Sequence, residues 1–481
     1  MQTPVSSPEA TTSEAATPGA ARLPQTLAEC HVVIEQLLQR VRLLEERVSL
    51  NSKNSSKPPS SDGPGGDNRA QRRASARKRG AQPGHKGHSR ALLDQSEVDR
   101  VVDCQPQAVC ECGGSVQLDG QPPRRHQVFD VPPMRAQVDE YRLHGGRCQA
   151  CGRACAGALP PGVPKGQLGP RALSLVGVLG TRYHLTQRKI RNLLDQLMGL
   201  SFSVGAISQA HGKVADALNT PVAQATASLR RAEALWMDET HYPREGVANW
   251  VWAAVQPKLA VFAIYPTRAR YVIPQLIGAD CTAAVTTDRY AAYAFIDPQR
   301  RQVCWAHLLR DFNRIAQRPG HAGRIGRRLQ ALGWVMFRRR EQDRLHGQGL
   351  EGLRRRVRAA LEQGAQQTQC SRTAKTCANV LALWPALWSF TANPVLQPTN
   401  NAAEQALRSL VLKRKISGPT RSRRGDRFLA YGFSVHETCV RQGRDLWHFM
   451  HQAVVAFIDK TVPPSLLPAP TVPSVAPAPS G

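Results

Sequence analysis

Three acidic residues, widely separated in the chain, occupy positions suited to holding metal ions. Asp238 closes the apolar run of residues 235–237, and Asp288 closes the strand-like run of residues 283–287. Glu404 lies in a segment with helical spacing that begins near residue 400. Carboxylates without a histidine or cysteine close by are hard oxygen ligands, which favour Mg²⁺ or Mn²⁺ over zinc. We therefore expect Asp238, Asp288 and Glu404 to form one site for two divalent ions.

Each acid also has an ordinary interpretation. Most acidic residues only solvate a surface, and Glu404 with Arg408 at i, i+4 fits a surface ion pair worth under about 1 kcal/mol. The combination is more informative than its members, because two acids end strands, the third lies on a helix, and the chain around them is strongly basic.

The segments around the two aspartates predict a sheet that brings them together. Strand-like runs cover residues 235–240, 250–255, 259–265 and 283–288, and a helical stretch covers residues 268–277. Short connections favour an antiparallel meander for the first three strands. The helix would then return the fourth strand parallel to the first. Asp238 and Asp288 would end two adjacent parallel strands on the same side of the sheet.

A fifth strand running into a helix is expected over residues 302–312. Cys304 and His307 are spaced i, i+3 there and could share a metal, but two ligands do not complete a site. We consider a phosphate contact by His307 or Arg310, or plain packing of both, the better interpretation.

The segments that follow are helical and basic. Residues 313–392 predict an α-helical insertion with an arginine-rich surface, and Thr399 or Asn400 is placed to cap the helix that carries Glu404. The basic, glycine-containing stretch 413–425 is suited to gripping DNA beside the acids, and two more helices close the fold at residues 428–440 and 445–458.

Charge points to a polyanionic partner. The chain has 481 residues and a formal net charge of +28, which suits nucleic acid because each neutralised phosphate releases counterions. An acidic membrane surface is the weaker alternative, since no basic amphipathic helix is obvious. No apolar run approaches the roughly 18 residues of a membrane span, and the N-terminus lacks the features of a secretory signal. We expect a cytoplasmic, nucleoid-associated bacterial protein.

The N-terminal part predicts a disordered start followed by a short coiled coil. Residues 1–24 are rich in Thr, Ser, Ala and Pro. Apolar residues then recur with heptad spacing from Leu27 to Val48, with Cys30 at one seam position. An amphipathic helix packed on its own protein is the alternative. A basic run over residues 68–90 is either a solvated tail or an arm for phosphates.

Half of the twelve cysteines lie between residues 104 and 155. Cys110 and Cys112 form one glycine-flanked pair, and Cys148 and Cys151 form a second, so the two pairs predict a structural tetrahedral Zn²⁺ site. The first pair has the tighter C-x-C spacing, and reduced, partly buried thiols are the alternative. Cys104 and Cys155 are spare thiols nearby.

Residues 166–230 predict helices, and residues 185–218 have the form of a helix-turn-helix. DNA contact and simple packing explain that stretch equally well.

The ordered motifs of the chain resemble those of the insertion-sequence-sixty-six family of DDE transposases over nearly the full length. The matching motifs are NSSKPPSSD (54–62), GAQPGHKGHSR (80–90), the cysteine pairs, MDETHY (237–242), TTDRYAAY (286–293), CWAHLLRDF (304–312) and NNAAEQALRSLVLKRKISGPTRS (400–422). The resemblance implies an RNase H-like catalytic domain in which Asp238, Asp288 and Glu404 are the acidic triad. It also implies an N-terminal zipper, a zinc-binding region and helical DNA-binding parts. The C-x-C pair departs from the C-x-x-C usual in the family.

The resulting expectation is an α+β multidomain transposase with a mixed-sheet core. Its boundaries are a disordered start (1–24), a zipper-like helix (25–50), a basic linker (51–95), a Cys-rich zinc module (96–160), a helical DNA-binding region (161–230), the first part of the core (231–312), the helical insertion (313–395), the second part of the core (396–460) and a disordered Pro-rich tail (461–481). The side chains expected to contact DNA are Arg72, Arg73, Lys78, Arg79, His85, Lys86, His307, Arg310, Arg408, Lys413, Arg414, Lys415 and Arg421.

The expected reaction is Mg²⁺-dependent phosphoryl transfer. Two ions would clamp the attacking and leaving oxygens, first for cleavage at the ends of a DNA element and then for attack of the freed 3′-hydroxyl on target DNA. The expected partners are DNA, further copies of the chain and accessory proteins of the same element. Two alternatives remain: a non-catalytic relative that only binds or represses element ends, and a nuclease without strand transfer.

Overall fold

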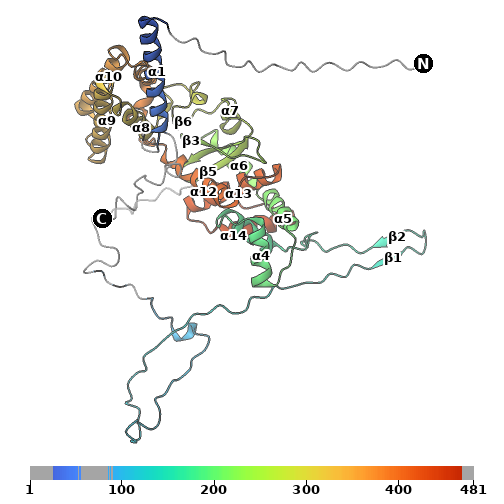
Figure 1. Ribbon diagram of the computed structural model, residues 1–481. Coiled ribbons are helices and arrows are strands. Elements are labelled where there is room, and N and C mark those ends of the chain that lie inside the picture. Colours follow the sequence, from blue (N-terminus) through green and yellow to red (C-terminus); the bar gives the residue numbers. More distant parts are fainter. Residues whose placement is uncertain (1–24, 52–53, 56–84, 86, 88–89, 469–481) are drawn as a thin grey trace, which may run out of the picture.

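The computed structural model describes residues 25–51, 54–55, 85, 87 and 90–468 (Figure 1). The expected disorder of residues 1–24 and most of the basic linker therefore lie outside the described residues. The Pro-rich tail is described as far as residue 468, and this part corrects the expectation of disorder. Leu466 is fully buried in the core, and its carbonyl accepts a hydrogen bond from Gln442 Nε2 at 2.8 Å.

A five-stranded mixed sheet forms the centre of the molecule, in the order β5-β4-β3-β6-β7. The strands are β3 (Ala234–His241), β4 (Trp250–Gln256), β5 (Leu259–Tyr265), β6 (Ala284–Thr287) and β7 (Arg301–Val303). The first three form the expected antiparallel meander, and β6 returns parallel to β3. The crossover helix α7 (Val272–Ile277) is shorter than expected.

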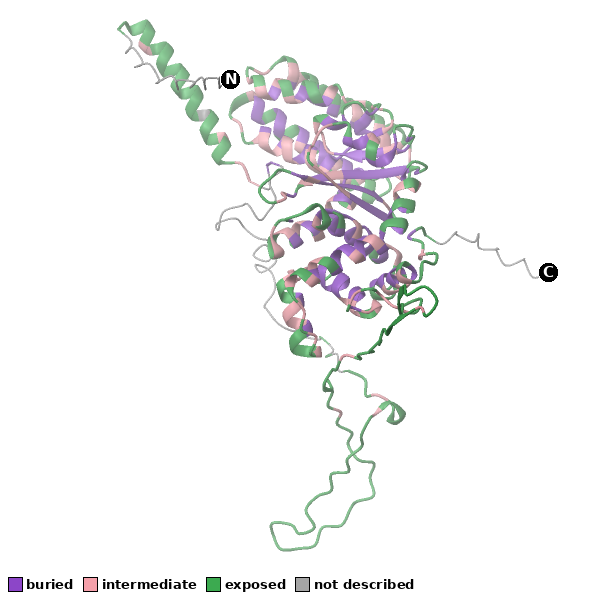
Figure 2. Ribbon diagram, turned by 90° about the vertical axis from the view of Figure 1, so that its right-hand side faces the viewer, coloured by how far each residue is buried: buried purple, intermediate pink, exposed green. Residues whose placement is uncertain are grey.

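Both faces of the sheet are buried, so successive residues of a strand enter different cores. Leu235 and Met237 of β3 belong to one core, and Trp236 between them belongs to the other. Figure 2 shows the sheet buried between helices. The strands therefore read as continuous apolar runs.

Helices from two distant parts of the sequence build the first core. They are α3 (Pro170–Thr181), α4 (Gln187–Met198), α5 (Val204–Ala217), α6 (Asn219–Leu229), α13 (Arg423–Gln442) and α14 (Leu446–Asp459). The expected turn between α4 and α5 is present, with Gly199 in a left-handed conformation. Because α3 and α5 contact α13 and α14, packing accounts for much of this helical region.

The second core lies under α8 (Trp305–Ala316), α12 (Asn401–Ser417) and the insertion. The insertion is helical as expected, with α9 (Gly320–Glu341), α10 (Gly347–Gln366) and α11 (Ser371–Leu381), followed by the 3₁₀ turns η4 (Pro385–Leu387) and η5 (Ser389–Thr391).

The N-terminal helix α1 (Leu27–Val48) begins with a capping box between Thr26 and Glu29. Its aliphatic seam residues are exposed, from 48% for Val41 to 87% for Val48, and Cys30 is half-buried. At its far end Glu46 forms ion pairs with Arg318 and Arg372. The helix is thus attached to the insertion by a polar contact, and its apolar seam packs against nothing in the described chain (Figure 2).

The Cys-rich region is not the compact module that we expected. It contains the 3₁₀ turn η2 (Gln95–Glu97) and the hairpin β1 (Gly145–Arg147) and β2 (Ala154–Ala156), and most other residues are extended and exposed. A segment that buries so few apolar side chains has no core of its own. Within the described residues, no helix combines the length and the apolar character that crossing a bilayer requires.

Candidate functional site

Asp238 lies inside β3 and not at its end, which corrects the expected strand boundary. β3 and β6 pair in parallel from Ala234 opposite Ala284 to Trp236 opposite Thr286. The same register, continued by two residues, sets Asp238 against Asp288, which directly follows β6. The two aspartates therefore occupy matching positions on neighbouring strands.

The pKa of Asp238 is raised well above its usual value. Burial is the main cause, and repulsion from the charges of Glu239, Asp288 and Glu404 adds to it. One backbone hydrogen bond, from Glu239 N to Asp238 Oδ1 at 2.9 Å, opposes the shift. The fold thus places the three predicted acids within electrostatic reach of one another, although they lie up to 166 residues apart in the sequence.

The backbone that carries Asp288 is held by a buried arginine. Arg301, 1% exposed, donates hydrogen bonds to the Thr287 hydroxyl at 2.9 Å and to the Asp288 carbonyl at 2.7 Å. The Asp288 carboxylate itself accepts the Tyr290 backbone N–H at 2.9 Å. This arginine fixes the turn and leaves the carboxylate of Asp288 half-buried and accessible.

Glu404 is placed by the first residues of α12. Asn400 precedes the helix and makes no side-chain cap, contrary to our expectation. Its Nδ2 donates instead to the carbonyl of Met237 at 2.8 Å, and its backbone N–H donates to Cys304 Sγ at 3.2 Å. The helix start is therefore tied to β3 one residue before Asp238 and also to the start of α8.

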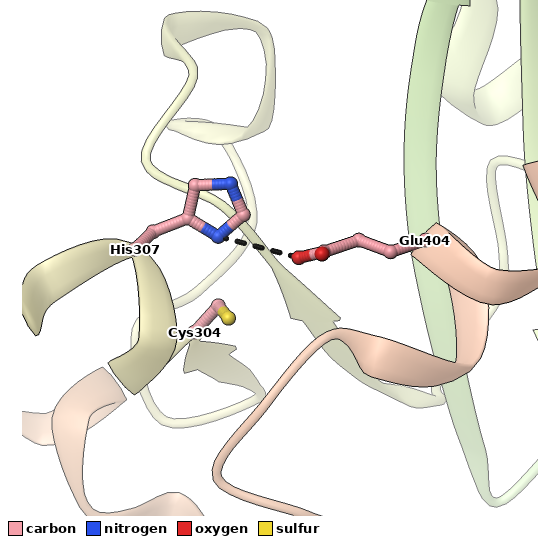
Figure 3. Close-up of side chains that lie close together, drawn as sticks. All are labelled: Cys304, His307 and Glu404. Atoms are coloured by element: carbon pink, nitrogen blue, oxygen red, sulfur yellow. Dashed lines mark ion pairs between the residues drawn. The ribbon is translucent and has the colours of Figure 1, made fainter. Parts of the chain in front are cut away.

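The side chain of Glu404 points toward α8 (Figure 3). Its Oε1 lies 3.5 Å from His307 Nδ1 and 3.9 Å from an Arg310 guanidinium nitrogen, so these residues face it in place of the expected Arg408. Burial raises the pKa of Glu404, Arg310 opposes the shift, and Asp288 adds to it. Burial, with help from nearby arginines, lowers the pKa of His307 to about 3. The imidazole in this contact is therefore neutral at physiological pH.

The acids and the neighbouring α8 residues form two overlapping sets of possible metal ligands. Among the described residues, Cys304, His307 and Glu404 form the group whose ligand atoms all lie within 4.8 Å of one another. The three acids are more widely spread than that group. Two ions about 3.5–4 Å apart also need a wider set of ligands than one ion does.

Sequence reasoning missed Glu239, the neighbour of Asp238. It is buried, and it accepts hydrogen bonds from Arg268 Nε at 2.7 Å and from the Tyr293 hydroxyl. Strand alternation was the available signal, because adjacent side chains of β3 must face opposite sides of the sheet. Its partners, Arg268 and Tyr293, could not be identified before the fold was known.

The predicted zinc ligands are not brought together. Cys148 and Cys151 lie in the β1–β2 turn, whereas Cys110 and Cys112 lie in a separate loop, and the two segments extend in different directions (Figure 1). Each pair does form a local turn, with Cys110 N bonded to Gly114 O and Gly152 N bonded to Cys148 O, both at 2.8 Å. Zinc binding by these cysteines stays a prediction, without support from their placement.

The predicted DNA contacts are distributed unevenly. Arg72, Arg73, Lys78, Arg79 and Lys86 lie outside the described residues. His85, Arg408, Lys415 and Arg421 are exposed, Arg414 is half-buried, and His307 and Arg310 lie beside Glu404.

The prediction for Lys413 is corrected by the structure. Its side chain is 7% exposed, its Nζ donates to the Leu185 carbonyl at 2.8 Å, and burial lowers its pKa to about 8. Lys413 therefore joins α12 to the helical region and is not free to contact a phosphate.

A mixed sheet with clustered acids, in a strongly basic chain, fits an enzyme that processes nucleic acid. A family model described as the Transposase IS66 family matches residues 165–427, which is more than half of the chain and includes all three acids. The chain belongs to this family, which supports a role in transposition and implies DNA binding. A second model, for a family of unknown function (DUF6444), matches residues 12–91. No curated protein matches the chain.

Proposed function

We propose that this protein is the DDE transposase of an insertion sequence. It would hydrolyse phosphodiesters at the element ends and then join the freed 3′ ends to target DNA. Asp238, Asp288 and Glu404 are the catalytic acids in this proposal. The observation that carries it is the placement of these residues: the β3–β6 register sets Asp238 against Asp288, and the bond from Asn400 to Met237 holds the start of the Glu404 helix against β3.

The donor set fits hard divalent cations. The carboxylates repel one another, which is unfavourable until a cation lies between them. Glu404 Oε1 is buried and has no hydrogen-bond partner among the described residues, so it has an unused ligand atom. Asp238, Asp288 and Glu404 would hold the two Mg²⁺ or Mn²⁺ ions. When bound, the ions supply charge stabilisation for the attacking and leaving oxygens.

The remaining residues of the site position these acids. Arg301 holds the turn of Asp288, Asn400 fixes the start of α12 against β3, and Glu239 anchors the backbone beside Asp238 through Arg268 and Tyr293. Such rigid placement lowers the reorganisation needed when charge develops in the transition state. We assign no protein nucleophile, because water and the DNA 3′-hydroxyl serve in the two steps.

Arg310 and His307 are proposed to meet the DNA backbone next to the acids. The Arg310 guanidinium can pair with a phosphate oxygen, and the neutral His307 ring can donate one hydrogen bond to it. The exposed basic residues Arg408, Lys415 and Arg421 extend the same interface along and beyond α12.

Three further features support the wider assignment. The sheet order, with a three-stranded meander joined to two parallel strands, is consistent with an RNase H-like core. The exposed seam of α1 is suited to pairing with another copy of the chain. The net charge of +28 suits a protein that holds both element and target DNA.

The test is nicking of supercoiled plasmid that carries the element ends, with Mg²⁺ against EDTA. Asp238→Ala, Asp288→Ala and Glu404→Ala should each abolish Mg²⁺-dependent cleavage while DNA binding survives. Glu233→Ala is the matched control, because this exposed acid precedes β3 and lies outside the site. Normal cleavage by any of the three variants would remove that residue from the assignment.

The same assay separates the other possibilities. A wild-type chain that binds element ends but never nicks them would fit a DNA-binding role alone. A chain that nicks but cannot join a pre-cut end to target DNA would be a nuclease.

A further inference from the structure

A second set of metal-type ligands overlaps the acidic site. Cys304 and His307 lie one helical turn apart at the start of α8, and Glu404 reaches the same point from α12 (Figure 3). Their ligand atoms all lie within 4.8 Å of one another. The spacing of Cys304 and His307 gave only two ligands, and the fold supplies the third from 97 residues further along the chain.

The polar atoms of this group are poorly satisfied. His307 Nδ1 and Glu404 Oε1 are both buried, lie 3.5 Å apart, and have no hydrogen-bond partner among the described residues. Cys304 is fully buried, and its Sγ accepts one N–H from Asn400. Unsatisfied buried polar atoms are rare and call for an explanation such as a missing ion.

The separation of two of the ligand atoms fits a single tetrahedral ion. Bonds of about 2.0–2.3 Å to sulfur, nitrogen and oxygen place the ligands of one zinc ion roughly 3.3–3.8 Å apart. The 3.5 Å between His307 Nδ1 and Glu404 Oε1 already falls in that range. Cys304 Sγ lies within 4.8 Å of both of these atoms.

We propose that Cys304, His307 and Glu404 bind a single borderline-soft divalent ion of the zinc class. A thiolate, an imidazole and a carboxylate are the donors that such an ion prefers, whereas Mg²⁺ avoids sulfur. Three protein ligands leave a fourth position for water. On binding, the Cys304 thiol loses its proton to solvent and becomes the thiolate ligand.

This site shares Glu404 with the acids, and its consequence for activity rests on the proposed function. An ion held by Cys304, His307 and Glu404 withdraws one ligand from the set that would bind Mg²⁺. Zinc is then a competitive inhibitor of cleavage, and the chain responds to the ratio of zinc to magnesium.

The direct test is titration of the metal-stripped full-length chain with Co²⁺, which reports a cysteine ligand by thiolate-to-cobalt charge-transfer absorption. The wild type should bind one equivalent more than Cys304→Ser, because any binding by the cysteine pairs of residues 110–151 is the same in both. His307→Gln should keep the thiolate band but weaken cobalt affinity by at least about 10-fold. Cys377→Ser, which removes another buried thiol, is the matched control.

Equal Co²⁺ stoichiometry and equal spectra for the wild type and a folded Cys304→Ser variant would overturn the proposal. Thermal denaturation of both chains establishes that the variant is folded. This arm needs no DNA, so its failure is distinct from failure of the transposase assignment.

A second measurement follows inhibition of Mg²⁺-dependent nicking by Zn²⁺, with each variant compared with its own zinc-free activity. Cys304→Ser should need at least about 10-fold more Zn²⁺ for half-inhibition than the wild type. Equal sensitivity would contradict the shared use of Glu404.

Discussion

At the scale of residues, two adjacent acids of β3 have opposite environments. Glu239 faces one side of the sheet, where Arg268 neutralises its charge and both Arg268 and Tyr293 donate hydrogen bonds to it. Asp238 faces the other side, where its charged neighbours Asp288 and Glu404 are also acidic. A difference of one position in a strand therefore separates a carboxylate that has a cationic partner from the one that we propose as a metal ligand.

The first prediction concerns the stability of the metal-free chain. The pKa values of Asp238 and Glu404 are raised by folding. The folded state thus binds more protons than the unfolded state once the pH exceeds the ordinary carboxyl value of about 4, and stability falls as pH rises from there through the raised pKa values. Asp238→Asn should flatten this dependence. At pH 7 in EDTA it should raise the thermal midpoint, by about 1–2 °C for each kcal/mol of repulsion removed.

Glu233→Gln, at an exposed acid, should leave the midpoint unchanged. Excess Mg²⁺ should stabilise the wild type more than Asp238→Asn. A lower midpoint for Asp238→Asn in EDTA would show that repulsion is not the dominant force on this side chain.

A residue could be predicted as part of the site from sequence alone when its type and its place in a strand or helix were enough to suggest the role. Asp238 lies in a recognisable strand, Asp288 directly follows one, and Glu404 lies in the first turn of a helix. Asn400 and Arg301 were missed as positioning residues, because their partners come from other elements.

Lys413 was misjudged for a different reason. It lies three residues after Leu410, on the buried face of α12, so helical periodicity opposed the DNA contact that its charge favoured.

At the scale of elements, the decisive junction is between β3, α8 and α12. Asn400 donates hydrogen bonds to the Met237 carbonyl and to Cys304 Sγ. Trp305 N donates to the Pro398 carbonyl at 2.8 Å. These bonds hold the first turn of α12 beside the middle of β3 and the start of α8. The position of Glu404 relative to Asp238 depends on them.

The second prediction tests this junction. Asn400→Ala removes the donor to the buried Met237 carbonyl and should lower the free energy of unfolding by about 1–3 kcal/mol. Cleavage should fall further than the loss of folded protein explains, because Glu404 is no longer held in place. Asn401→Ala, at the exposed next residue, should change stability by under about 0.5 kcal/mol. Chemical denaturation and nicking rates at matched folded concentrations provide the measurements, and equal effects of the two variants would rule out this role.

The third prediction concerns α1, whose heptad positions suit a parallel pair. With Leu27, Ile34, Val41 and Val48 at a, Arg40 falls at g and Glu45 at e, so Arg40 of one helix faces Glu45 of a second copy. Glu46, which contacts Arg318, lies on the opposite side of the helix and leaves the seam free.

Light scattering should therefore detect a dimer of the wild-type chain. The variant in which Leu37 and Leu44 are both changed to Glu should be a monomer in the same measurement. Mild oxidation should link Cys30 to the same residue of the second copy, and Cys30→Ser should remove that link. The control variant changes Gln39 and Glu35 to Ala, two exposed residues of α1 outside the seam. It should stay a dimer. A monomer at micromolar concentration, with the seam intact, would refute the pairing.

Most elements of the sheet were predictable because each is a short apolar run between turn residues. The Cys-rich region was not, because cysteine spacing indicates a ligand set but does not supply the buried apolar surface that fixes a fold.

At the scale of the whole molecule, the helical insertion presents a basic surface. The insertion exposes many arginines, including Arg324, Arg327 and Arg328 on one stretch of α9. These residues neighbour the element that carries His307 and Arg310, since α8 and α9 are in contact. The insertion is therefore expected to extend the DNA interface beyond the acids.

The fourth prediction measures this interface through its salt dependence. Changing Arg324, Arg327 and Arg328 together to Ala should reduce the slope of log affinity against log salt by up to about 2.7, or about 0.9 for each phosphate that is no longer neutralised. Lys413→Met should leave the slope unchanged, because that buried side chain contacts Leu185. Filter binding or anisotropy at several salt concentrations gives both slopes, and an unaltered slope in the triple variant would remove this part of α9 from the interface.

The order of the core could be anticipated because short connections and one crossover restrict the topology. The placement of α3 and α5 against α13 and α14 could not. Contacts between segments about 200 residues apart depend on surface shape, which local patterns do not encode.

The hydrogen bonds from Trp305 N to the Pro398 carbonyl and from Asn400 N to Cys304 Sγ close the neck of the insertion. More than ninety residues thus leave and re-enter the core at a single point. The insertion can become longer or shorter, or be replaced, without moving the acids on β3 and α12. Changes in the insertion and changes in the acidic site can therefore accumulate independently within one polypeptide.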